Sequence, residues 1–143
     1  GRISPVSLST TGIIRSLPTA MNWPITPESM YWGTRFIFER YGLPVYISEN
    51  GLACPDVVTP DGAVHDEARI KFMHDYISEL ERAADEGADV AGYYAWSFMD
   101  NFEWNCGYGP RFGLVHIDYA TQKRTPKDSY YAYRDFIKRF YGK

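Results

Sequence analysis

The chain of 143 residues is 17% aromatic and carries a formal net charge of −3 at pH 7, with a sequence pI near 5.6. Because this charge provides no basic surface, we expect no nucleic acid partner. The sequence lacks a charged and apolar leader, and no apolar run approaches the ~20 residues that span a bilayer. We therefore expect no membrane contact and a cytoplasmic location.

The aromatic residues and the cysteines narrow the kinds of site that the chain could carry. Its 12 Tyr, 8 Phe and 4 Trp exceed the needs of a small core, which favours an aromatic pocket or interface. Cys54 and Cys106 are too few for a zinc site or a disulfide framework, and the three histidines have no ligand spacing. We therefore expect neither a metal nor a cofactor.

The chain opens with a segment, 1–25, that is rich in Ser, Thr, Pro and Gly and shows no sustained period. This composition predicts an irregular approach segment. Thr26 and Pro27 then supply an N-cap and a proline at the first helical position. They predict a helix that ends at Gly42.

A short β-branched and aromatic run at 45–47 predicts a buried strand of a parallel sheet, which Asn50 and Gly51 end. Glu49 therefore lies at the end of a rigid strand, where enzymes built on parallel sheets keep reactive groups. The alternative is a strand-end glutamate that simply faces solvent.

Helical and extended patterns alternate along the rest of the chain. Asp66 opens a second helix that runs to Gly87, with apolar residues at helical spacing: Ile70, Met73, Ile77, Leu80 and Ala84. A second strand follows at 90–98 and a short extended segment at 112–119. Residues 125–129 introduce a third helix, whose inward stripe is Tyr133, Phe136, Ile137 and Phe140. This order predicts an α/β fold with a parallel sheet.

The loop after the second strand, 99–109, concentrates carboxylate, amide and indole groups. Because the carboxyl ends of parallel strands point the same way, Glu49, Trp96, Glu103 and Trp104 should converge at one side of the protein. Acids and indoles together favour a sugar, since indole faces pack on sugar C–H groups and carboxylates accept hydroxyl donors. Each residue also has a structural alternative: Trp96 as core, Trp104 as a loop anchor, and Glu103 as a solvated or capping acid.

At these motifs the chain resembles glycoside hydrolase family 1, the β-glucosidases and their relatives. The resemblance runs from about Met21 to the C-terminus. The family's Thr-Glu-Asn-Gly strand end corresponds to 48–51, with Ser48 in place of the usual Thr, which keeps the hydroxyl. Its Gly-Tyr-x-x-Trp-Ser-x-x-Asp-Asn-x-Glu-Trp segment corresponds to 92–104, its Arg-Phe-Gly-Leu run to 111–114, and its entry to the last helix to 124–129.

The resemblance implies that residues 1–143 are the C-terminal part of a (β/α)8 TIM barrel, namely the sixth helix and the seventh and eighth strands with their helices. The barrel is incomplete as given, since a whole one needs about 250 residues.

The resemblance also assigns roles to single residues. It implies that Glu49 is the nucleophile of a retaining mechanism. Glu103 would hold the outer hydroxyls of the sugar, Trp104 would donate its indole N–H, Trp96 would lie under the ring, and Phe112 would close the pocket wall. Glu49 and Glu103 look like a catalytic pair within this chain alone, but the family takes its acid/base from an Asn-Glu-Pro segment. That segment does not occur in these residues.

Two functions from different classes follow. The first is a retaining β-glycosidase of the β-glucosidase type, active only with the missing N-terminal barrel part that supplies the acid/base. The second is a non-catalytic sugar-binding or structural fragment of such an enzyme. The expected partners are a β-glucoside or related small saccharide, and either a complementary N-terminal barrel segment or a second copy of the chain.

Overall fold

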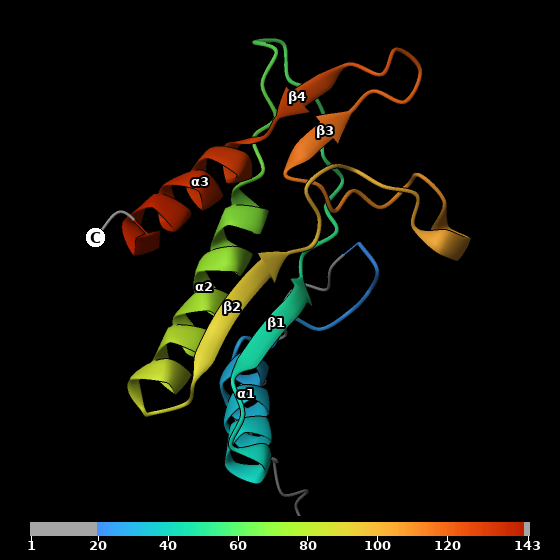
Figure 1. The fold of residues 1–143 in the computed structure, drawn as a ribbon. Coiled ribbons are helices and arrows are strands. Elements are labelled where there is room, and N and C mark those ends of the chain that lie inside the picture. Colours follow the sequence, from blue (N-terminus) through green and yellow to red (C-terminus); the bar gives the residue numbers. More distant parts are fainter. Residues whose placement is uncertain (1–19, 142–143) are drawn as a thin grey trace, which may run out of the picture.

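The computed structural model describes residues 20–141. Along the chain, three helices alternate with two strands, and a 3-10 turn and a small hairpin come before the last helix (Figure 1). The elements are α1 (Glu28–Tyr41), β1 (Val45–Asn50), α2 (Glu67–Asp85), β2 (Val90–Ala95), η1 (Trp104–Cys106), β3 (Val115–Ile117), β4 (Arg124–Pro126) and α3 (Asp128–Tyr141). This order matches the predicted alternation of helices and strands. Residues 20–27 contain no helix or strand, and the rest of the expected approach segment lies outside the described residues.

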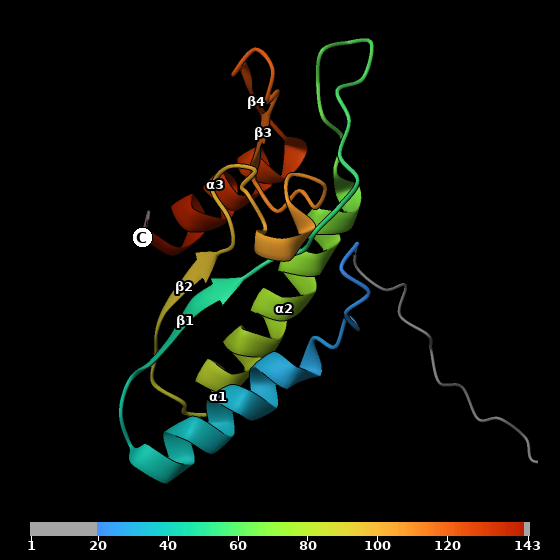
Figure 2. The ribbon, with the colours of Figure 1, turned by 90° about the vertical axis from the view of Figure 1, so that its right-hand side faces the viewer.

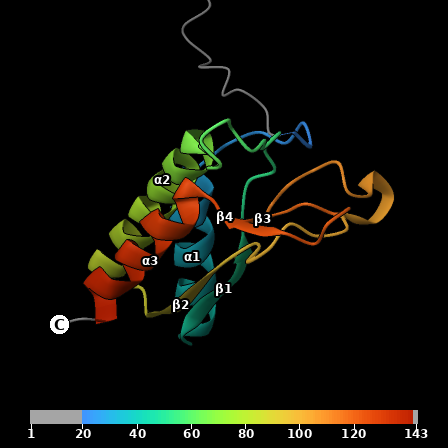
Figure 3. The same cartoon turned by 90° about the horizontal axis from the view of Figure 1, so that it is seen from above.

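Strands β1 and β2 form a parallel two-stranded sheet, as predicted. The three helices lie on one side of this sheet (Figure 3). The side chains of Tyr46 on β1 and Tyr94 on β2 are 60% and 58% exposed. Parallel sheets are stable when both faces are covered, so the exposed tyrosines indicate a face that is built to be covered.

The core lies between α2, the sheet and α3. Its main cluster joins Phe72, Met73, Tyr76 and Ile77 of α2 to Leu52, Cys54 and Leu114, and residues of β2 and α3 pack against it. The buried face of α2 is wider than the predicted stripe because α1 and α3 pack on its two sides. Of the apolar residues at helical spacing, Ala84 is exposed, and its neighbour Ala83 is buried instead.

The third helix also departs from its predicted inward stripe. Tyr133 and Phe136 pack against the main cluster as predicted. Ile137 is 38% exposed, because it faces a groove beside β2. The side chain of Phe140 lies outside the described residues. Within the part of the chain that the structure covers, no helix is both long and apolar enough to cross a bilayer.

The predicted helix ends are only partly correct. Gly42 adopts the left-handed conformation (φ 62°) and ends α1, as predicted. At the other end, α1 begins at Glu28 without a side-chain cap, so the prediction of Thr26 as N-cap is wrong. The backbone N–H groups of Ser29 and Met30 donate to the carbonyls of Thr26 and Pro27 instead.

The carboxylate of Asp66 serves a different helix from the one it precedes. Helix α2 begins directly after Asp66, as predicted, but that side chain makes no cap bond to α2. One carboxylate oxygen accepts the backbone N–H of Ser129 at 2.8 Å, and the other accepts the Ser129 hydroxyl and the Arg69 guanidinium. Asp66 thus holds the first turn of α3 against the start of α2.

A small hairpin leads into α3, and the sequence predicted only its first strand. The extended segment at 112–119 contains β3, but residues 124–126 were expected to belong to the helix entry. They form β4, which pairs antiparallel with β3 in the register Val115 to Pro126. The hairpin lies beyond the carboxyl ends of β1 and β2, together with the loop that follows β1 (Figures 1 and 2). These segments surround the place where functional side chains were expected.

His65 ties the loop after β1 to the start of α3. Its Nδ1 lies 2.7 Å from Asp128 Oδ2, and its Nε2 lies 3.0 Å from Asp61 Oδ2. The hydrogen bonds with Asp128 and Asp61 raise the pKa of His65 above its ordinary value, because both carboxylates favour the imidazolium. A raised folded-state pKa adds stability that is complete below the unfolded pKa and is lost as the pH rises through the folded pKa.

We therefore expect the free energy of unfolding to fall as the pH rises above about 6.5. In His65→Gln this part of the pH dependence should disappear. Urea unfolding of both proteins at about pH 5.5 and about pH 8.5 measures it. His74→Gln, at an exposed histidine of α2, is the control and should behave like the parent. An unchanged pH dependence in His65→Gln would refute the role of His65.

Candidate active site

Glu49 lies in an irregular interval near the end of β1. Ile47 pairs with Tyr93 and Asn50 pairs with Ala95, so Ser48 and Glu49 together oppose one residue of β2. An extra residue in one strand re-aims the side chains beside it, and such irregularities are frequent next to active sites. Glu49 is exposed at this position. The strand-end placement was predicted, whereas the irregular pairing was not.

The residues after Glu49 are bound to the end of β2. The backbone N–H of Trp96 donates to the carbonyl of Asn50 at 2.8 Å, and the hydroxyl of Tyr93 donates to Asn50 Oδ1 at 2.9 Å. Burial raises the pKa of Tyr93, which keeps this hydroxyl a donor. A Cβ on Gly51 would stand 1.6 Å from the carbonyl oxygen of Trp96, so only glycine fits there. These contacts thus fix the position of the backbone at Trp96 relative to the strand end that carries Glu49.

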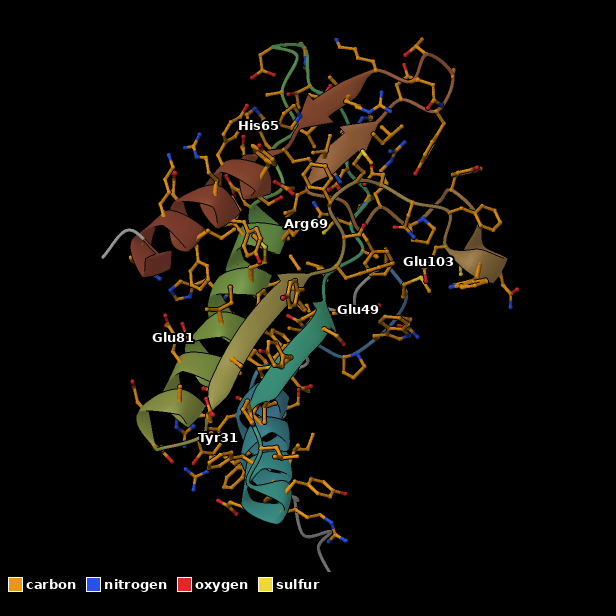
Figure 4. The ribbon with its side chains drawn as sticks, viewed as in Figure 1. Tyr31, Glu49, His65, Arg69, Glu81 and Glu103 are labelled. Atoms are coloured by element: carbon orange, nitrogen blue, oxygen red, sulfur yellow. The ribbon has the colours of Figure 1, made fainter. Side chains whose placement is uncertain are left out.

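The loop after β2 presents the second acid and the second indole. Trp96 is 38% exposed and Trp104 is 81% exposed, while Glu103 is half-buried. Asn101 Nδ2 donates to Glu103 Oε2 at 2.9 Å, and the backbone N–H of Glu103 donates to the carbonyl of Gly107 at 2.7 Å. Figure 4 shows Glu49 from β1 and Glu103 from this loop at the same end of the sheet. The two acids thus lie at the same end of the sheet as expected, and the convergence of Trp96 and Trp104 on them stays a prediction.

Phe112 lies deeper than a pocket wall would. Its side chain is 2% exposed, and its ring centroid lies 6.4 Å from that of Trp23. Its carbonyl accepts the backbone N–H of Ser97 at 3.1 Å, which links it to the start of the loop. The predicted contact of Phe112 with a sugar stays a prediction.

A buried group of ionic side chains, which sequence reasoning missed, supports the loop. The carboxylate of Asp100 accepts Lys127 Nζ at 2.7 Å, Arg111 Nη1 at 2.6 Å, and the backbone N–H groups of Gly113 and Ile117. Burial alone would raise the pKa of Asp100, but the bonds from Lys127, Arg111 and Ile117 outweigh it and hold this pKa below its ordinary value. Asp100 therefore stays charged beside the candidate site.

The same group continues to the loop after β1. Lys127 Nζ also donates to Asp56, whose carboxylate accepts Arg69 Nη2 at 2.7 Å. Arg69, whose side chain is 1% exposed, donates to the carbonyl of Arg111 as well. Asp100 and Lys127 stand inside motifs singled out in the sequence, but nothing in those motifs indicates that the two side chains meet. The loops after β1 and β2 are thus joined through buried charges.

The described residues do not suggest a metal centre. Across positions 20–141, no three His, Cys, Asp or Glu side chains come together in a way that could hold a metal ion. The two cysteines are free, and burial raises the pKa of Cys54 to about 11, so its thiol is protonated at neutral pH.

A parallel strand–helix–strand unit with acids at the carboxyl end of its sheet is typical of α/β proteins that keep their functional groups at the strand ends. The chain belongs to glycosyl hydrolase family 1, whose family model matches residues 10–140. It is 50% identical over 126 residues to Beta-glucosidase A of Thermotoga maritima, covering 87% of this chain and 28% of that protein. It is 47% identical over 131 residues to a Bifidobacterium breve bifunctional beta-D-glucosidase/beta-D-fucosidase, with shares of 85% and 28%.

The structural comparison agrees with these relationships. The fold is similar to that of the Thermotoga maritima beta-glucosidase in complex with glucoimidazole, with a TM-score of 0.84 and 48% sequence identity. The match covers 86% of this chain and 28% of the solved chain. The chain thus spans a little over a quarter of the length of these relatives and has the fold of a partial barrel.

Proposed function

We propose that this chain is the C-terminal part of a retaining β-glycosidase of the β-glucosidase type, in which Glu49 is the nucleophile. The observation that carries the proposal is Glu49 itself, exposed at the carboxyl end of β1 and tied through Asn50 and Gly51 to Trp96. A carboxylate on a rigid strand end can attack an anomeric carbon and form a glycosyl-enzyme intermediate that water then opens. In the barrel, α1 would be the sixth helix, and β1 and β2 the seventh and eighth strands.

The substrate would be a terminal β-linked sugar. Relatives at about half identity are named beta-glucosidases, and one of them binds glucoimidazole in a solved structure. In this chain, Glu103 would accept the outer sugar hydroxyls, Trp104 would donate its indole N–H, and Trp96 would lie under the ring. Phe112 would support the wall from below, in keeping with its burial.

The acid/base would come from outside these residues. A retaining enzyme needs a second carboxyl about 5 to 5.5 Å from the nucleophile. We assign Glu103 to sugar binding, as the family resemblance implies, and Asn101 Nδ2 donates to one of its oxygens. The N-terminal barrel part that supplies the acid would also complete the sheet, because within residues 20–141 β1 and β2 pair only with each other.

Two apolar surfaces fit such a complement. A groove of about 510 Å³ follows β2 between α2 and α3, lined by Val90, Tyr94 and Ile137 among others. On α1, Trp32 and Phe36 are 51% and 61% exposed and contact each other at 5.6 Å between ring centroids. Open strand edges and exposed aromatic surface favour association with further barrel elements. Self-association of the chain is the alternative source of the complement, and the experiment below distinguishes the two.

The test is covalent labelling with an activated 2-deoxy-2-fluoro-β-glucoside, whose good leaving group needs no protonation. It is applied to the chain alone and to a completed barrel, in which this chain replaces the part of the Thermotoga maritima Beta-glucosidase A that it matches. Intact mass and peptide mapping locate the adduct. We expect an adduct on Glu49 in the completed barrel.

Each outcome of the labelling decides something. An adduct on Glu49 in the chain alone would mean that the chain, by itself or by self-association, builds a competent nucleophile site. An adduct in the completed barrel alone would mean that a complementary segment is required and that the chain by itself is a non-catalytic fragment. A completed barrel without an adduct on Glu49 would overturn the proposed function.

A further inference from the structure

Asn101 stands between the start of the loop after β2 and the carboxylate of Glu103. Its Nδ2 donates to Glu103 Oε2 at 2.9 Å. Its Oδ1 lies 3.3 Å from Ser97 Oγ, and that hydroxyl is also 2.7 Å from the carbonyl of Met99. The amide of Asn101 thus contacts Ser97 through its oxygen and the half-buried carboxylate of Glu103 through its nitrogen.

The chemistry of the two partners dictates how the amide is turned. A carboxylate only accepts hydrogen bonds, so the nitrogen of Asn101 must face Glu103 and the oxygen must face Ser97. A bond from this nitrogen occupies Oε2 of Glu103 and leaves Oε1 for a further donor. Without it, the long glutamate side chain would be free to rotate, and its carboxylate would be ordered only by the ligand.

The backbone of Asn101 is anchored independently of its side chain. The hydroxyl of Tyr119 donates to the carbonyl of Asn101 at 3.2 Å. The guanidinium of Arg111 lies 5.0 Å from the ring centroid of Tyr119, and Arg111 is bound to the buried carboxylate of Asp100. Because Asp100 precedes Asn101 directly, the buried ionic group fixes the position from which the amide reaches Glu103.

We propose that Asn101 is a positioning residue that orients the carboxylate of Glu103 and thereby sets the preference between sugars that differ in their outer hydroxyls. This inference rests on the proposed function. A site built to bind a hydroxyl discriminates strongly against a sugar that lacks it, provided that its polar groups are held in place. Asn101 holds Glu103 in place, and it acts through Glu103 rather than on the sugar.

The experiment measures kcat/KM of the completed barrel for 4-nitrophenyl β-D-glucoside and for 4-nitrophenyl β-D-fucoside, which lacks the 6-hydroxyl and carries the 4-hydroxyl in the axial orientation. Asn101→Asp is nearly isosteric and keeps an acceptor for Ser97, but it removes the donor to Glu103 and faces it with a like charge. We expect the glucoside-to-fucoside ratio to fall by roughly 10- to 100-fold, the size of loss that a misplaced binding group causes. Asn101→Ala should lower the ratio in the same direction.

The matched control is Asn105→Ala, at an exposed asparagine of the same loop, which should keep the parent ratio. The decisive comparison repeats Asn101→Asp in a Glu103→Ala background. If Asn101 acts through Glu103, the second replacement should not change the ratio further. If Asn101 had a merely structural role, its replacement would instead lower kcat/KM equally for both substrates. The loss would then be the same in the parent and in the Glu103→Ala background.

The outcomes separate this inference from the function on which it rests. An active parent whose ratio is unchanged by both Asn101 variants would refute the positioning role and leave the proposed function standing. Equal effects of Asn101→Asp with and without Glu103 would also refute it. A completed barrel that forms no adduct on Glu49 would refute the proposed function and this inference with it.

Discussion

Replacing Glu49 by alanine in the completed barrel is expected to lower turnover of an aryl β-glucoside by on the order of 10⁴-fold or more, as removal of a single catalytic nucleophile does elsewhere. The reason is that alanine cannot form the glycosyl-enzyme intermediate. Azide should restore part of the turnover, because it fits the space left by the carboxylate and attacks from the same side. The product should be the inverted glycosyl azide, identified by its anomeric configuration.

Glu103→Ala is the matched control, since the chain alone presents Glu49 and Glu103 as a pair of acids at one end of the sheet. With Glu49 intact, this variant should still form the covalent adduct, and azide should not rescue it. Its glucoside-to-fucoside preference should be weakened. Near-normal turnover of Glu49→Ala would show that the nucleophile is assigned to the wrong residue, and azide rescue of Glu103→Ala with an inverted product would move the assignment to Glu103.

Replacing Lys127 by methionine is expected to destabilise the chain by about 3 to 5 kcal/mol, the cost of removing one partner from a buried ion pair. The side chain of Lys127 is 0% exposed, and its Nζ contacts Asp56 and Asp100, whose side chains are 4% and 0% exposed. Methionine fills similar space, so the loss would report the charge rather than a cavity. Both carboxylates would keep one arginine partner each, Arg69 and Arg111.

The measurement is the urea midpoint at constant m-value. Lys123→Met is the control, since Lys123 is exposed in the turn between β3 and β4 and its replacement should stay within about 0.5 kcal/mol. A Lys127→Met protein within about 1 kcal/mol of the parent would mean that the two arginines suffice to hold both carboxylates.

Glu49 and Lys127 belong to the same end of the sheet but have different tasks. Glu49 would carry the chemistry, whereas Lys127 joins the loops after β1 and β2 beneath it through Asp56 and Asp100. A loss of Lys127 should therefore loosen the loop that carries Glu103 before it affects the strand that carries Glu49. This order follows from the contacts, because β1 and β2 are held by their own backbone pairing.

The sequence predicted several features of the fold because each of them depends on residues that are close together in the chain. The helical spacing of apolar residues, the glycine that ends α1 at Gly42, and the turn residues after Glu49 act locally. They predicted the order of helices and strands and the placement of Glu49 at a strand end. The spacing within 92–104 was specific enough to indicate the family.

Tertiary structure decided what depends on partners far apart in the chain. It assigned the carboxylate of Asp66 to Ser129 rather than to the helix that Asp66 precedes, and it paired residues 124–126 with β3. It also placed Phe112 beneath Trp23. No local pattern encodes such contacts, because buried polar and aromatic groups take whichever partner the packing brings within reach. For the same reason, the irregular pairing at Glu49 and the bond from Asn101 to Glu103 became visible only once both strands and their loops were in place.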